Sequence, residues 1–252
     1  MINKNILILG GTGFIGKIFT SILEKKNKIT LVGSSGDINF LIGESISGAL
    51  KELIKINDII IFASWNFVLK KHEYTSKHIG SVNEILILCK KYQKRLLFVS
   101  TSLARENSKS IYNKTKYLCE KEVLLFNQSI IRLGVIYSEL NLKGNIYLKL
   151  SKIPSFLGYK ILLKPNNKKF YIDTFEGIGE FFKNFSFKTS NTYENNSAPV
   201  ELTQIIDMFN KKKNKYIFFN WKFVYFILKS LSVLGIKFRI NTDSLMSIWG
   251  DN

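Results

Sequence analysis

The sequence predicts an α/β fold, a doubly wound parallel sheet with a small C-terminal lobe. Three observations lead to this prediction: short apolar runs typical of buried strands, helical patterns between them, and a glycine-rich turn after the first run. Strands that alternate with helices are joined by right-handed crossovers, which produce a parallel sheet with helices on both faces. The 252 residues are enough for one such domain and a small lobe.

Apolar runs and helical patterns alternate through the first half of the chain. The expected strands are Ile6–Leu9, Ile29–Val32, a brief Phe40–Ile42, Asp58–Ala63, Leu96–Val99 and Ile130–Leu133. The expected helices are Lys17–Glu24, Gly48–Ile56, Ile79–Lys91 and Tyr112–Phe126. Asn, Lys, Ser and Thr gather at Lys164–Lys169 and Asn184–Pro199, and this composition predicts loops.

The glycine-rich turn joins the first expected strand to the first expected helix. Gly10 permits a tight turn, Gly13 lacks the Cβ that would block a pyrophosphate, and Gly16 lets the helix pack close to the strand. The helix N-terminus offers unpaired N–H groups and a partial positive charge to the phosphates. Between a strand and a helix, this spacing predicts dinucleotide binding.

The formal net charge of +18 comes mostly from lysine, because only four of the 37 basic residues are arginine. Nucleic-acid recognition favours arginine forks and clustered basic patches, and the sequence has neither, so no nucleic-acid partner is expected. The lysines are expected to be solvated surface residues. Their positive field would attract a substrate that carries a diphosphate.

Cysteine and histidine usage predicts neither a disulfide nor a metal site. Cys89 and Cys119 lie in helical patterns without metal or redox spacing, which indicates reduced thiols in a cytoplasmic protein. His72 and His78 have no matching set of ligands. The first strand begins within five residues of the N-terminus, so no signal peptide is expected.

The tail from Tyr216 to Ile236 is apolar and aromatic, but Asn220, Lys222 and Lys229 interrupt it, so a membrane span is not expected. Three interpretations stay open. The segment forms a buried helix of the C-terminal lobe, or Phe218–Leu234 lies on a membrane surface. Alternatively, it forms the contact of a homodimer.

Hydroxyl, phenol and ammonium groups come together in the sequence around residue 110. Ser102 follows the strand Leu96–Val99, at the carboxyl edge of the sheet where ligands bind in such folds. Tyr112 and Lys116 are four residues apart at the start of a helix, so they share a face. An ammonium beside a phenol lowers its pKa, which favours acid/base chemistry near neutral pH.

Together these motifs resemble the short-chain dehydrogenase/reductase superfamily, and more narrowly the extended or atypical branch of NAD-dependent nucleotide-sugar epimerases, dehydratases and reductases. The resemblance runs through most of the first 180 residues and implies a Rossmann domain that binds NAD or NADP. The cofactor residues that it implies are Gly10, Thr12, Gly13, Phe14, Ile15, Gly16, Ser34, Ser35, Glu44, Ser45, Ala63, Ser64, Tyr112, Lys116, Gly134 and Val135.

By this resemblance Tyr112 is the catalytic acid/base, and Lys116 tunes its pKa and contacts the ribose. Ser102 is the hydroxyl partner, with Thr101 as its substitute if the alignment shifts by one residue. The implied activity is epimerisation of a nucleotide sugar or reduction of a ketosugar. The alternative is a non-catalytic cofactor-binding sensor or scaffold.

Two departures from the branch narrow these expectations. Dehydratases carry an Asp-Glu pair after the catalytic hydroxyl, whereas this chain has Leu103-Ala104, which disfavours dehydration. The second strand ends in Gly33-Ser34-Ser35 without a carboxylate for the ribose or an arginine for a 2′-phosphate, so NAD and NADP both stay open, with a lean to NADP. The expected domains are 1–137 with 170–190 for the cofactor, and 138–169 with 191–252 for the substrate.

Overall fold

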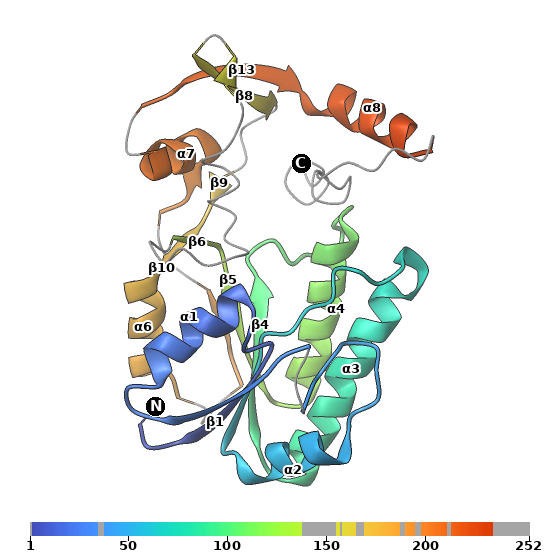
Figure 1. Cartoon of the computed structure of the whole chain (residues 1–252), viewed down its shortest axis with the longest axis vertical. Coiled ribbons are helices and arrows are strands. Elements are labelled where there is room, and N and C mark those ends of the chain that lie inside the picture. Colours follow the sequence, from blue (N-terminus) through green and yellow to red (C-terminus); the bar gives the residue numbers. More distant parts are fainter. Residues whose placement is uncertain are drawn as a thin grey trace.

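The computed structural model describes residues 2–34, 38–137, 155–156, 158–164, 169–186, 190–194, 198–210 and 213–233. Figure 1 shows the main sheet with its helices at the bottom, and the shorter strands with two further helices above it. No helix in these ranges is long and apolar enough to span a bilayer.

The main sheet has six parallel strands, which confirms the predicted fold class. Their spatial order is β11 (Thr192–Glu194), β5 (Ser129–Leu133), β4 (Arg95–Thr101), β3 (Ile59–Phe62), β1 (Asn5–Leu9) and β2 (Lys28–Val32). The order reverses between β1 and β3, since the chain first builds outward from β1 to β2 and then returns to the other side of β1 for β3. Such a reversal opens a crevice at the carboxyl ends of the strands.

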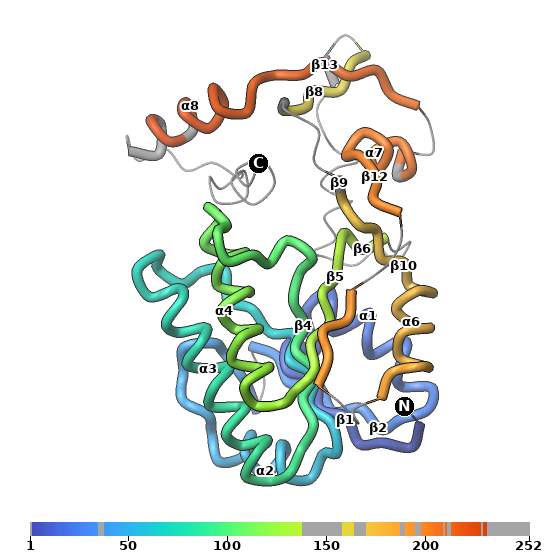
Figure 2. The backbone as a smooth tube through the Cα atoms, turned by 180° about the vertical axis from the view of Figure 1, so that it is seen from behind, coloured from blue at the N-terminus to red at the C-terminus, as the bar shows by residue number. Residues whose placement is uncertain are grey.

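Helices cover both faces of this sheet (Figures 1 and 2). One face carries α2 (Gly48–Ile56), α3 (Lys71–Lys91) and α4 (Ile111–Leu125), and the other carries α1 (Phe14–Leu23) and α6 (Phe175–Asn184). Because side chains alternate along a strand, Leu7 and Leu9 of β1 enter the first core, and Ile6 and Ile8 enter the second. All four side chains are fully buried.

Three segments differ from the sequence predictions. Phe40 and Ile42 are buried, but the expected strand Phe40–Ile42 does not form, since Phe40 N–H donates to the Gly33 carbonyl in an irregular connection. α3 begins at Lys71, eight residues before the expected start. β11 lies inside the expected loop Asn184–Pro199 and joins the main sheet, although residues 191–252 were assigned to the substrate lobe.

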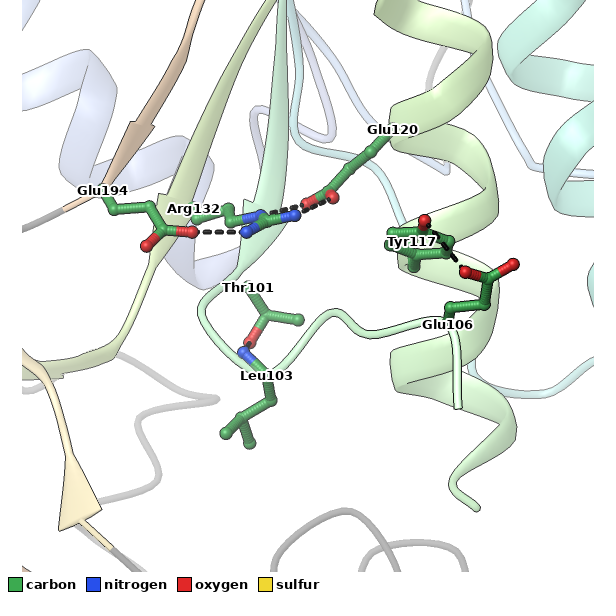
Figure 3. A network of polar contacts seen from close by, with 7 residues as sticks. All are labelled: Thr101, Leu103, Glu106, Tyr117, Glu120, Arg132 and Glu194. Atoms are coloured by element: carbon green, nitrogen blue, oxygen red, sulfur yellow. Dashed lines mark hydrogen bonds and ion pairs between the residues drawn. The ribbon is translucent and has the colours of Figure 1, made fainter. Parts of the chain in front are cut away.

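An arginine holds β11 against the sheet. Arg132 of β5 donates from Nε and Nη2 to the Glu120 carboxylate of α4, at 2.8 and 2.6 Å, and from Nη1 to Glu194 of β11 (Figure 3). Glu120 is almost fully buried, and a buried carboxylate needs such a partner. The charge pair therefore helps to explain why a polar three-residue segment adds to the sheet.

The remaining elements form the upper part of the molecule. They are the parallel pair β6 (Val135–Tyr137) and β10 (Ile172–Thr174), the sheet of β7 (Ser155–Phe156), β8 (Tyr159–Lys164) and β13 (Lys215–Asn220), the pair β9 (Lys169–Phe170) and β12 (Val200–Glu201), and the helices α7 (Leu202–Asn210) and α8 (Trp221–Val233). A small core joins Leu162 of β8 to Ile205 and Ile206 of α7.

The apolar tail is not a single buried helix. Residues Lys215–Asn220 form β13, which pairs in parallel with β8, and only the following residues form α8. β13 alternates in exposure, and Phe223 and Phe226 of α8 are 63% and 68% exposed. The aromatic and β-branched residues before Asn220 favour a strand, so the interpretation of the tail as one buried helix is wrong.

Candidate active site

The glycine-rich turn brings the ends of β1, β3 and α1 close together. Gly10 has a φ of +85°, and a Cβ there would lie 2.7 Å from Cα of Ser64 at the end of β3. A Cβ on Gly16 would lie 2.4 Å from the Gly10 carbonyl oxygen. Gly13 is the N-cap of α1 and provides no side-chain cap, and the first turn has no acidic residue. This helix N-terminus therefore presents N–H groups and a positive dipole end without an internal anion.

Replacing Gly16 by alanine is expected to lower the free energy of unfolding by about 1–3 kcal/mol, because the new Cβ overlaps backbone atoms. Gly48→Ala is the matched control, since a Cβ at that helical position has open space around it and is expected to stabilise α2 slightly. Urea denaturation measures both variants. Equal stability of Gly16→Ala and the wild-type protein would contradict the close packing of this turn.

The residues expected around the cofactor's adenosine half lie near the end of β2 and before α2. The Thr12 side chain lies over Gly33, where a Cβ would approach Thr12 Oγ1 to 2.4 Å, and Ser34 is exposed. Ser35 lies outside the described residues. Glu44 and Ser45 are exposed in the turn that follows Gly43, whose N–H donates to Ser81 Oγ of α3 at 2.9 Å.

Four further residues that are expected to contact the cofactor lie at the ends of β3 and β5. Ala63 N–H donates to the Leu9 carbonyl at 2.8 Å, and Ala63 and Ser64 are partly buried. Gly134 N–H donates to the Asp173 carboxylate, and Val135 N–H donates to the Tyr171 carbonyl at 2.8 Å. β10 therefore fixes the chain that follows β5.

Lys116 is buried at the carboxyl end of β4. Ser110 caps α4 by accepting from Asn113 N–H, so Lys116 lies in the second turn of the helix. Its Nζ donates to the Val99 carbonyl of β4 at 2.7 Å and lies 3.9 Å from the centre of the Trp65 indole. Burial lowers the pKa of Lys116 from 10.5 to about 7. The lysine therefore titrates near neutral pH.

Tyr112 lies one turn before Lys116, among aromatic rings. Its ring packs edge-on against Trp65 with centroids 5.5 Å apart, and it stacks on Phe67 at 5.8 Å. Burial raises the pKa of the Tyr112 phenol, and the nearby Tyr74 phenol raises it further. The sequence led us to expect a lowered pKa beside Lys116. That expectation is wrong, because desolvation of the phenol acts in the opposite direction.

The hydroxyl groups at the end of β4 lie in different environments. Ser100 Oγ is buried and has no hydrogen-bond partner among the described residues. Thr101 Oγ1 accepts from the Leu103 N–H at 3.3 Å in the turn after the strand (Figure 3). Ser102 is partly buried, and its N–H donates to the Leu133 carbonyl at 2.9 Å. Because a hydroxyl that accepts one hydrogen bond can still donate its own O–H, Thr101 and Ser102 both stay candidates for the hydroxyl partner.

An aromatic cluster around Trp65 was not foreseen from the sequence. Trp65 Nε1 donates to Tyr74 Oη at 2.7 Å, and its ring packs on the His78 imidazole with centroids 4.0 Å apart. Burial lowers the pKa of His78 to about 4, so this histidine is neutral at physiological pH. Trp65 directly follows the Ala63-Ser64 strand end. This position of a large aromatic residue, directly after a strand end, was the one signal in the sequence that could have indicated the cluster.

The donor set fits a dinucleotide better than a metal ion. The uncapped N-terminus of α1 and the close glycine turn suit a pyrophosphate. The orphaned Ser100 hydroxyl and the buried Lys116 ammonium are polar groups near the same sheet edge. Among the described residues, no three His, Cys, Asp or Glu side chains gather as metal ligands. Cys89 and Cys119 are free and buried.

Several solved structures of enzymes that are named for nucleotide sugars share this fold. Similar solved structures include an ADP-L-glycero-D-manno-heptose-6-epimerase from Helicobacter pylori, with a TM-score of 0.63, 15% identity and 86% of each chain covered. A UDP-N-acetylglucosamine 4-epimerase from Methanobrevibacter ruminantium, in complex with UDP-N-acetylmuramic acid, has a TM-score of 0.65 and 14% identity, and covers 87% of this chain and 86% of its own.

A third similar structure is a dTDP-4-dehydrorhamnose reductase from Bacillus anthracis in complex with NADP. Its TM-score is 0.67 at 11% identity, and the match covers 97% of this chain and 98% of the reductase. No protein-family model matches the sequence, and no curated protein matches it either. At these identities the comparisons establish the fold.

Proposed function

We propose that this protein is an NAD(P)-dependent enzyme that epimerises a nucleotide sugar or reduces a nucleotide-linked ketosugar. The observation that carries the proposal is the position of Tyr112 and Lys116, one helical turn apart, where α4 meets the carboxyl end of β4. The glycine-rich turn lies at the same edge of the sheet, two strands away. Neighbours with this fold include epimerases and a reductase of sugar nucleotides.

Each residue has a distinct task in this proposal. The backbone N–H groups at the start of α1 hold the pyrophosphate, and the glycines let it approach. When bound, the nicotinamide accepts or returns the hydride. Tyr112 takes or gives the hydroxyl proton of the sugar, and Ser102 donates a hydrogen bond to the same oxygen. A ligand hydroxyl that replaces the Val99 carbonyl as partner of Lys116 would keep the ammonium charged beside Tyr112.

A second candidate function is a cofactor-binding sensor without turnover. The indole of Trp65 covers the Lys116 ammonium at 3.9 Å and also packs against Tyr112. With the raised pKa of Tyr112, this arrangement is unsuited to proton transfer unless ligand binding moves Trp65. The sensor function and the enzyme function share the cofactor site and differ only at the aromatic cluster.

Identification of the bound nucleotide tests the proposal. We expect mass spectrometry of the purified, denatured protein to detect retained NAD(H) or NADP(H) if the protein is an epimerase, and titration to restore binding if it is a reductase. Nucleotide sugars supplied with the coenzyme should then be converted, as followed by NMR. Failure to bind either coenzyme would overturn both candidates, whereas binding without conversion of any sugar would favour the sensor. The cytoplasmic location stays a prediction.

A further inference from the structure

The sheet of β8 and β13 exposes an apolar outer face. Leu162 of β8 and Phe218 of β13 point towards α7 and contribute to the small core. Because side chains alternate along a strand, their neighbours point the other way. The register places Ile217 beside Ile161, and both are exposed. The outer face therefore carries apolar side chains in adjacent positions on two strands.

The same face continues at both ends of this pair. In the next row Phe219 of β13 is 46% exposed and lies beside Leu163 of β8. In the preceding row Lys215 lies beside Tyr159, with its ammonium 5.7 Å from the ring centre. We call these six residues the outer face of the sheet. An aromatic residue and a lysine thus border an apolar centre.

Helix α8 follows β13 directly and leads away from the sheet of β8 and β13 (Figures 1 and 2). Trp221 is buried at its start, whereas Phe223, Phe226 and Ile227 are exposed. These three residues are spaced by three and four, so they form one stripe of the helix. Lys222 is exposed beside this stripe. Apolar stripes flanked by lysines are typical of helices that lie in the plane of a membrane surface.

The charged side chains of the outer face and α8 are all positive. The sequence from Met208 to Thr242 contains no Asp or Glu, and neither does β8. Lys213, Lys215 and Lys222 are exposed there. Aromatic and apolar side chains with only cationic neighbours complement an anionic lipid surface, where each lysine adds attraction and each aromatic ring enters the interface.

We infer that the outer face of the sheet and the exposed stripe of α8 bind the surface of an anionic bilayer. The protein as a whole supports this choice of partner through its net charge of +18. A bilayer interface also fits the mixture of Phe, Ile, Tyr and Lys better than a purely apolar partner would. The binding surface lies on the side of β8 and β13 that faces away from α7. The inference does not depend on the proposed sugar chemistry.

Flotation of the full chain with vesicles tests this inference. Vesicles of phosphatidylcholine alone are compared with vesicles of equal parts phosphatidylglycerol and phosphatidylcholine. We expect binding to the anionic vesicles that weakens with added salt, and little binding to the neutral ones. Replacing both Phe223 and Phe226 by serine should weaken binding about tenfold or more. Leu125→Ser, at an equally exposed site on α4, should leave binding unchanged.

A charge reversal separates specific binding from general attraction. Lys215→Glu combined with Lys222→Glu should weaken binding about tenfold or more, whereas the same reversal at the exposed Lys25 and Lys26 should have a much smaller effect. Equal losses in both pairs would overturn the inference, and so would a wild-type chain that does not float. A dimer that the Phe223/Phe226 substitutions dissociate, without flotation, would assign the surface to a second copy instead. Coenzyme binding should be unchanged in every variant. A protein that binds no coenzyme would therefore contradict the proposed function alone, and a protein that binds no vesicles would contradict this inference alone.

Discussion

Replacing Tyr112 by phenylalanine is expected to lower kcat about 10²–10⁴-fold, because the variant keeps the ring and loses only the hydroxyl that exchanges the proton in the proposed function. The ring contacts with Trp65 and Phe67 should persist, so folding and coenzyme affinity should stay close to those of the wild-type protein. The measurement is turnover of the nucleotide sugar identified by NMR, together with coenzyme titration followed by the intrinsic tryptophan fluorescence.

Tyr117→Phe is the matched control for this prediction. Tyr117 lies on the same helix, and its hydroxyl donates to the exposed Glu106 at 3.4 Å (Figure 3). A hydrogen bond at this length on the surface contributes little, and the group is not part of the aromatic cluster. We expect activity within about twofold of the wild-type value. Equal activity of the two variants would remove Tyr112 from the proposed mechanism.

The main sheet could be predicted because its strands are continuous apolar runs that need both faces covered. β1 begins one residue before the expected strand Ile6–Leu9 and ends at the same residue. β3 lies inside the expected strand Asp58–Ala63. The short polar β11 could not be predicted in this way. It pairs with β5 and carries Glu194, which binds Arg132, so a contact between distant parts of the chain stabilises it. Local composition alone indicates a loop there.

The positions of the candidate site residues on their helix and strand could be predicted from the sequence. The contacts and the burial of these side chains could not. The spacing of Tyr112 and Lys116 places both on one face of α4, and the strand end before Ser102 follows from the apolar run of β4. The sequence did not reveal that Trp65 would lie on the Lys116 ammonium. That contact depends on how the loop after β3 packs against α3 and α4. The pKa values of both residues depend on this packing, and the expected direction for Tyr112 was wrong for the same reason.

Lys116→Met is expected to stabilise the fold below neutral pH while it abolishes turnover. The folded state lowers the pKa of Lys116 from 10.5 to about 7, so below pH 7 the protein keeps a buried ammonium, which costs about 4–5 kcal/mol relative to the unfolded chain. Methionine fills a similar volume without the charge. Loss of the hydrogen bond to the Val99 carbonyl offsets about 1–2 kcal/mol of the stability that is gained by removing the buried charge. The variant should therefore be more stable by about 2–4 kcal/mol near pH 6.

The pH dependence distinguishes this effect from simple repacking. Between the folded pKa near 7 and the unfolded pKa near 10.5, the unfolded wild-type chain binds more protons than the folded one, so wild-type stability rises with pH. The methionine has no proton to lose. Its advantage in urea denaturation should therefore shrink by about 2–3 kcal/mol from about pH 6 to about pH 9. Lys114→Met, at an exposed position on the same helix, should show neither the gain nor the pH dependence. A Lys116→Met variant that is less stable than the wild-type protein by the same amount at both pH values would contradict the buried ammonium, since the lost contacts would then be the only effect.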